Sequence, residues 1–208
     1  MAEPKQERAT RTRALILRAA AEVFDESGYS GASISKIMNR AGVTQGGMYF
    51  HFKSKKRLAL AVMSSQQTFI DFPSEGAGLQ RVIDLTFHLA HELQTNPLIR
   101  ASIRLAVEQG EFGVRDDTAY QDWVALVETY LLEARQRGEL LPEVDEHDFA
   151  VVLVSAFTGS QLFSSVASAR ADLPSRIVLL WRYLLPGLTP PQTRASLRVE
   201  PADRTPAT

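Results

Sequence analysis

Apolar residues recur every three or four positions through most of the chain, which predicts helices and no strands. The first such segment covers residues 7–27 and ends at Gly28, a residue type suited to a left-handed helix terminus. A shorter amphipathic segment, ISKIMNRA, follows Ser33 and ends at Gly42. This pattern predicts an all-α protein.

Later segments also begin at residues that cap helices. Thr44 precedes QGGMYFHF, and Ser54 opens a longer helix expected to reach about Asp71. After a loop, helices are expected at residues 77–95, 97–110, 118–138, 146–169 and 174–186. Residues 187–208 are rich in Pro, Thr, Ala and Arg and lack an apolar face, which predicts a disordered tail.

The two short helices around Gly42 predict a helix-turn-helix, because glycine permits the turn and Thr44 can begin the second helix. The second helix of such a motif lies in the major groove, with its N-terminal end toward the bases. The sequence thus predicts a three-helix DNA-binding domain over residues 1–53. Phe50 and Phe52 are assigned to core packing, because aromatic side chains at this spacing are mostly buried.

The candidate DNA contacts lie on the second helix of the motif and beside it. Gln45 can contact a base edge, and Thr44 or Tyr49 can contact a phosphate. Gly46 and Gly47 each cost about 1 kcal/mol of helix propensity, which fits a close approach of the backbone to DNA. The predicted DNA-binding residues are Ser33, Thr44, Gln45, Gly46, Gly47, Met48, Tyr49, His51, Lys53 and Lys55.

Charge is unevenly distributed along the chain. The net charge is −1, yet residues 1–57 carry 11 Lys and Arg against 5 Asp and Glu, while residues 58–208 carry 12 against 19. A basic N-terminal part supports binding to a polyanion such as DNA. Basic residues on both flanks of the motif are expected to neutralise phosphates: Arg8, Arg11, Arg13, Lys53, Lys55, Lys56 and Arg57.

Composition argues against several other classes of protein. The chain has no cysteine and only four histidines, so we expect neither a metal nor a cofactor. His88 and His91 could share a metal, but without a third ligand they are better explained as ordinary surface or core residues. We find no GxSxG, Walker loop or GxGxxG after a strand, so no enzyme is expected. With no membrane-spanning run and no signal segment, we expect a soluble cytoplasmic protein.

Residues 28–63, GYSGASISKIMNRAGVTQGGMYFHFKSKKRLALAVM, resemble the signature of the TetR family of repressors. The resemblance implies a homodimer that binds a pseudo-palindromic operator in double-stranded DNA through its first three helices. It also implies that residues 54–186 form a ligand-binding and dimerisation domain, in which the last two long helices of each subunit make the interface. Apolar residues at helical spacing are expected there: Phe149, Val152, Leu153, Ala156, Phe163, Val166, Ile177, Leu180, Trp181 and Leu184.

The body of the chain resembles the γ-butyrolactone autoregulator receptors of antibiotic-producing bacteria. The similar segments are RLAVEQG at 104–110, Trp123 after YQD, RGELLP at 137–142 and AFTGSQ at 156–161. This resemblance implies that a small lipophilic lactone, butenolide or furan releases the repressor from promoters of antibiotic or other secondary-metabolite genes. A multidrug or antibiotic sensor that controls efflux is the alternative.

Position by position, the resemblance assigns effector contacts to Gln66, Trp123 and Thr158. Trp123 would form an aromatic wall, the Thr158 hydroxyl would donate a hydrogen bond, and Gln66 would couple the ligand to the fourth helix. The alternatives are a core tryptophan, a hydroxyl bonded to its own backbone, and a solvent-facing glutamine.

The chain departs from the receptor pattern TKGALYFHF, because it has TQGGMYFHF. Gln45 replaces a lysine and Gly47 replaces an alanine. An amide is better matched to adenine than a lysine is, so a different operator preference is expected.

Overall fold

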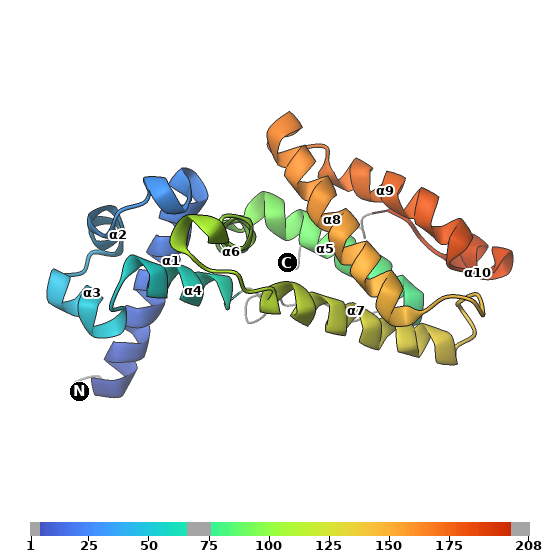
Figure 1. Ribbon diagram of the computed structural model, residues 1–208, viewed down its shortest axis with the longest axis horizontal. Coiled ribbons are helices and arrows are strands. Elements are labelled where there is room, and N and C mark those ends of the chain that lie inside the picture. Colours follow the sequence, from blue (N-terminus) through green and yellow to red (C-terminus); the bar gives the residue numbers. More distant parts are fainter. Residues whose placement is uncertain (1–4, 66–75, 201–208) are drawn as a thin grey trace, which may run out of the picture. The chain divides into compact units, whose positions relative to one another are not determined.

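The computed structural model describes residues 5–65 and 76–200, and every regular element in those ranges is helical (Figure 1). The prediction of an all-α protein is therefore confirmed. The chain divides into two compact units. The first contains Met1–Asp71 with Asn96–Ala119, and the second contains Phe72–Thr95 with Tyr120–Thr208.

The first unit is built from an N-terminal run of helices and a segment from the middle of the chain. Its elements are α1 (Lys5–Gly31), α2 (Ile34–Ala41), α3 (Gln45–His51), α4 (Lys55–Met63), α6 (Pro97–Val107) and the 3-10 turn η2 (Gln109–Phe112). Helix α6 packs against both α1 and α4. A segment distant in sequence thus belongs to the same compact unit as the predicted helix-turn-helix.

Side-chain caps begin the short helices where the sequence predicted them. Ser33 accepts a hydrogen bond from the backbone N–H of Lys36 at the start of α2. Thr44 and Ser54 cap α3 and α4 in the same way. Gly42 ends α2 with a φ of 64°, as its predicted role as a left-handed terminus requires.

Helix α4 ends at Met63, earlier than the predicted end near Asp71. The hydroxyls of Ser64 and Ser65 donate to the carbonyls of Leu60 and Val62, and such side-chain bonds compete with the backbone bonds that would extend a helix.

The second unit contains α5 (Gly78–Thr95), α7 (Thr118–Gln136, from Tyr120 onward), α8 (Glu146–Ser168), α9 (Leu173–Leu184), η3 (Leu185–Gly187) and α10 (Pro191–Ser196). Helix α9 packs against both α5 and α8. Trp181 on α9 is completely buried, and its indole nitrogen donates to Thr86 Oγ1 at 2.9 Å. A tryptophan expected at the dimer surface is therefore a core residue of one protomer.

Residues 187–200 differ from the disordered tail that the sequence predicted. Leu188 and Thr189 are buried, and α10 follows them. The backbone N–H of Leu141 donates to Leu188 O, and the Thr189 hydroxyl donates to Glu139 O. This segment gains order from the α7–α8 connection, a contact between residues far apart in the sequence. Residues 201–208 lie outside the described part of the chain.

Candidate DNA-binding and effector sites

Helix α3 exposes a bare N-terminal end. Gln45 and Gly46 are exposed, and a Cβ atom added at Gly46 would meet nothing within 4 Å. Thr44 is exposed as well, although its hydroxyl already caps the helix. No side chain at Gly46 therefore keeps another molecule away from the backbone of this helix turn. Among the other predicted contacts, Ser33 and Lys53 are exposed and His51 is half-buried.

Two residues of α3 have the opposite exposure to that predicted. Met48 is completely buried, so it is a core residue and cannot contact a base. Phe50, which was assigned to the core, is 71% exposed and lies edge-on to His51 at 5.0 Å between ring centroids. Phe52 is buried as predicted. In a seven-residue helix the buried face is a single narrow stripe, and here Met48 occupies it.

Lys55 makes its contacts within the first unit, although the sequence placed it among the DNA contacts. Its Nζ donates to Ala32 O at 2.7 Å and lies 4.3 Å from the centre of the Tyr29 ring. Burial lowers the pKa of Lys55, since a low-dielectric environment disfavours the charged form. Lys56 Nζ likewise donates to Gly113 O at 3.3 Å. Lys53 and Lys56 are both exposed, whereas Lys55 is half-buried.

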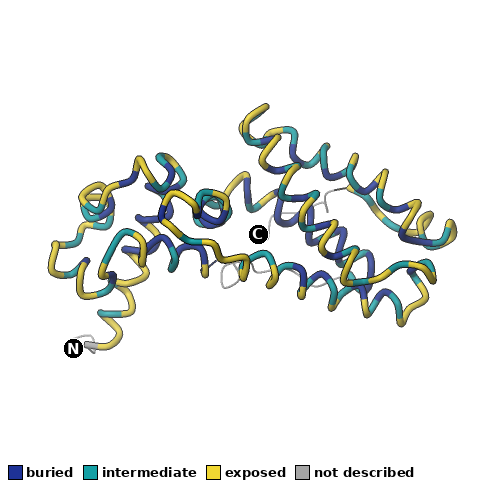
Figure 2. Tube along the Cα trace, in the orientation of Figure 1, coloured by how far each residue is buried: buried dark blue, intermediate teal, exposed yellow. Residues whose placement is uncertain are grey.

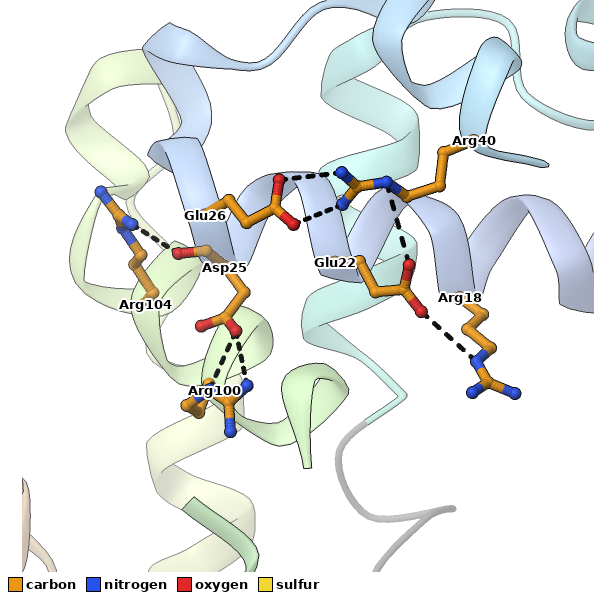
Figure 3. A network of polar contacts seen from close by, with 7 residues as sticks. All are labelled: Arg18, Glu22, Asp25, Glu26, Arg40, Arg100 and Arg104. Carbon is orange, nitrogen blue, oxygen red and sulfur yellow. Dashed lines mark hydrogen bonds and ion pairs between the residues drawn. The ribbon is translucent and has the colours of Figure 1, made fainter. Parts of the chain in front are cut away.

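Ion pairs connect α1 with α6 and with α2 (Figure 3). Arg100 on α6 binds the Asp25 carboxylate on α1 at 2.8 Å, and Arg104 donates to the Asp25 backbone carbonyl. On the α2 side, Arg40 binds Glu26 through two nitrogens, at 2.7 and 3.0 Å. The hydrogen bonds between Arg40 and Glu26, together with their opposite charges, lower the pKa of Glu26 and raise that of Arg40.

A second set of contacts closes over Gly28, where α1 bends with a φ of 66°. Glu108 accepts a hydrogen bond from the backbone N–H of Tyr29 at 2.8 Å and binds Arg104 at 2.7 Å. A Cβ atom at Gly28 would lie 2.6 Å from Arg104 and 3.0 Å from Glu108, so any other residue would have to displace the ends of both side chains. The Tyr29 ring also packs on Phe112, with centroids 4.4 Å apart.

The contacts around Gly28 set the direction in which the chain leaves α1 for α2 and α3. Sequence inspection missed Glu108 as part of this arrangement. The only signal available was its place in the RLAVEQG segment, which marks a resemblance without showing what the carboxylate binds.

The predicted effector residues are placed only in part. Gln66 lies outside the described residues. Trp123 is half-buried on α7. Thr158 is half-buried on α8, and its hydroxyl donates to Val154 O at 2.8 Å. That bond is the backbone alternative considered for Thr158, and it uses the hydrogen that an effector carbonyl would need.

Helices α8 and α9 are apolar on two sides. Leu153, Phe157, Ile177 and Trp181 face the core, so three residues expected at a dimer surface, Leu153, Ile177 and Trp181, lie inside the protomer. Another apolar set is exposed along the same helices (Figure 2): Val151, Val152, Leu162, Phe163, Val166, Leu179 and Tyr183. An open hollow of about 380 Å³ lies beside it, lined by Ser175, Val178, Leu179 and Arg182.

By length and composition α8 could cross a membrane. Of its most apolar window 28% is buried in the protomer, so most of this apolar surface is left uncovered. Apolar surface of this extent indicates an interaction site.

Within the described ranges no group of three or more His, Cys, Asp or Glu side chains is placed to hold a metal ion.

The capped α2–Gly42–α3 unit with its bare, exposed second helix defines a helix-turn-helix DNA-binding protein. Comparison with known proteins gives the family. Residues 16–62 match the model of the bacterial regulatory proteins of the tetR family, and residues 76–190 match that of the tetracyclin repressor-like C-terminal domain. The chain belongs to the TetR family of transcriptional regulators, which are not enzymes.

Similarity to individual proteins extends over nearly the whole chain. The A-factor receptor protein of Streptomyces griseus is 39% identical over 196 residues, which cover 94% of this chain and 70% of that protein. The structure of TylP, a TetR regulator from Streptomyces fradiae, matches with a TM-score of 0.83 and 39% identity, covering 93% of this chain and 94% of the other. A γ-butyrolactone receptor described as ArpA-like matches with a TM-score of 0.72 and 31% identity, covering 90% and 93%.

Regulators of this family bind operator DNA as dimers and respond to a small-molecule effector. The exposed apolar side of α8 and α9 fits that assembly, since a second copy would cover it.

Proposed function

We propose that this regulator is a cytoplasmic repressor of antibiotic or other secondary-metabolite genes, and that a γ-butyrolactone, butenolide or furan signal releases it from its operator. The observation that carries the proposal is the 39% identity to the A-factor receptor protein, which extends through both units and not only through the conserved type of DNA-binding motif. The likeness to the ArpA-like γ-butyrolactone receptor supports the same ligand class.

The proposed DNA contacts follow from exposure on and around α3. They are Ser33, Thr44, Gln45, Gly46, Gly47, Tyr49, His51 and Lys53. Met48 and Lys55 are left out because the protein core uses both. Phe50 joins the set, since an exposed aromatic ring can contact a thymine methyl group.

We further propose that the operator is pseudo-palindromic, because a two-fold symmetric dimer presents two equal recognition helices. Half-sites would lie about one helical turn apart, roughly 34 Å. Gln45 would favour adenine through its amide, where a lysine would favour guanine. Selection of bound duplexes from a random-sequence pool tests both points. The wild type should enrich an adenine at the position where Gln45→Lys enriches a guanine.

In the proposed mechanism, the effector favours an arrangement of the dimer that does not fit the operator. Reversing a 1:99 equilibrium to 99:1 takes a difference in affinity of about 5.5 kcal/mol between the two arrangements. Trp123 is the proposed aromatic wall of the effector site. Gln66, three residues after the end of α4 and outside the described residues, is the proposed coupling residue.

The test is release of a fluorescent operator duplex while lactone, butenolide and furan probes are titrated. Release by at least one of these classes is expected, and Trp123→Phe should weaken the response. If lipophilic cations release the duplex and none of the three classes does, the alternative of a multidrug sensor replaces this function.

A further inference from the structure

Gln161 is a polar residue in the apolar core of the second unit. It lies on the buried stripe of α8, one turn after Phe157, and only 1% of its surface is exposed. Its Oε1 accepts a hydrogen bond from Arg170 Nη2 at 3.5 Å. Its Nε2 has no hydrogen-bond partner in the structure as described over residues 76–200. The core therefore contains an amide with unused donors.

The neighbouring arginine determines which way this amide points. A guanidinium carries only donors, so the amide oxygen faces Arg170 and the NH₂ group faces away from it. Arg170 is itself held in place, because its backbone adopts a φ of 69° at the corner between α8 and α9 and its carbonyl accepts from Gln94 Nε2 at 2.8 Å. The unused donors are thus kept in one orientation.

A buried donor without an acceptor lowers stability, and such groups in native proteins are usually completed by water or a ligand. An aliphatic side chain of similar volume would continue the apolar part of the stripe, Leu153 and Phe157, whereas the other buried polar residue of the stripe, Ser164, already bonds Asp172. The amide is therefore best explained by a partner that is bound only part of the time.

Thr158 lies three residues before Gln161, so the two side chains are neighbours on the surface of α8. The Thr158 hydroxyl donates to Val154 O, which leaves its oxygen as an acceptor only. A ligand carbonyl near this part of α8 needs a donor that Thr158 does not supply. Gln161 Nε2 is a buried donor one turn away.

We propose that Gln161 Nε2 donates the hydrogen bond that binds the carbonyl oxygen of the effector. This assignment rests on the proposed function of a lactone-responsive repressor and names a contact within it. The ligand class is a lipophilic molecule with a carbonyl group that enters the second unit beside α8.

The experiment compares α-hexyl-γ-butyrolactone with 3-hexyltetrahydrofuran, which keeps the ring and the alkyl chain but lacks the carbonyl. Calorimetric titration of the full-length protein should show that Gln161→Met weakens lactone binding about tenfold, the size expected for one buried hydrogen bond, and leaves ether binding unchanged. The same substitution should raise the Tm of the effector-free protein by about 2–4 °C, because it removes the unpaired amide.

Gln136→Met is the matched control, since it removes an exposed amide at the end of α7 in the same unit and takes no part in the contacts of Arg170. Its lactone affinity should equal that of the wild type. Gln161→Leu provides a second apolar variant should methionine disturb packing.

Equal lactone affinity in the wild type and in both Gln161 variants would overturn the assignment and leave a bound water as the partner of the amide. Equal binding of lactone and ether by the wild type would overturn it as well, without use of any variant. A wild-type protein that binds none of the lactone, butenolide and furan probes would overturn the proposed function itself, so the two failures are distinguishable.

Discussion

In the first unit, charged side chains of α6 reach across to α1 and complete its bend, whereas in the second unit α8 and α9 bury one apolar side and expose another. Arg100, Arg104 and Glu108 all end on α1 atoms or on one another. The exposed side of α8 and α9 includes Phe163 and Leu179, which are 62% and 49% exposed although the Arg176 guanidinium lies over the Phe163 ring.

The difference shows what each unit needs from its surroundings. In the described part of the first unit no buried side-chain N or O atom lacks a hydrogen-bond partner, so this unit can present α3 as a preformed surface. The second unit leaves apolar area that is stable only when another surface covers it, as a second copy does in a TetR dimer. Four tests, three of them comparisons between paired substitutions, can break or sharpen this contrast.

The largest effect is expected at the exposed side of α9. Leu179→Asp would bury a carboxylate in the subunit interface and raise the dimer dissociation constant more than 100-fold, about 3 kcal/mol. Light scattering over a concentration series measures the change. Leu132→Asp is the control, because Leu132 on α7 is 48% exposed and Leu179 is 49% exposed. A Leu179→Asp protein that stays dimeric at the wild-type concentration would contradict the assignment of this side as the interface.

Next in size is the bend of α1. Gly28 and Gly42 have nearly equal φ angles, 66° and 64°, but only Gly28 has neighbours that an added Cβ would strike. Gly42→Ala should lower the free energy of unfolding by about 1 kcal/mol through backbone strain alone, and Gly28→Ala by at least about 2 kcal/mol. Urea denaturation of both variants gives the comparison. Equal losses would mean that Arg104 and Glu108 move aside freely.

The two lysines that flank Ser54 should separate DNA binding from stability. Lys53→Gln should reduce the slope of log affinity against log salt by about 0.9, the effect of one phosphate contact, and leave the Tm unchanged. Lys55→Gln should lower the free energy of unfolding by about 1 kcal/mol, because it loses the bond to Ala32 and the contact with Tyr29. Operator titrations at several salt concentrations, with thermal scans, decide the matter. A changed salt slope in Lys55→Gln with unchanged stability would restore Lys55 as a DNA contact.

The smallest effect concerns an exposed pair of the second unit. Glu128 binds His147 Nδ1 at 3.0 Å, and this hydrogen bond and charge raise the pKa of the imidazole above its ordinary value near 6.5. Since the folded state holds the proton more tightly, this contribution to stability is complete below pH 6.5 and is lost as the pH rises through the folded pKa. The Tm difference between the wild type and His147→Gln should therefore be larger at pH 5.5 than at pH 8.5. A difference that grows with pH would exclude the pair as a stabilising contact.

Much of the fold could be predicted because its boundaries depend on neighbours in sequence. Ser33, Thr44 and Ser54 each bond a backbone N–H three residues ahead, so each helix start is a local property. Pro97 likewise begins α6 where its missing N–H costs nothing. The family signature over residues 28–63 indicated the DNA-binding function for the same reason, since the turn at Gly42 and helix α3 follow one another directly in the chain.

Tertiary structure decided which of these side chains face solvent. Met48 and Phe50 stand two residues apart on one short helix, and only the packing of that helix within the first unit, where it contacts α1, determines that the first is buried and the second exposed. Lys55 bonds within the first unit because Tyr29 and Ala32 lie beside it, and Leu188 is ordered because the Leu141 N–H donates to its carbonyl. Helix termini are set by bonds a few residues long and can be inferred from sequence, whereas burial depends on contacts between distant segments and requires the folded chain.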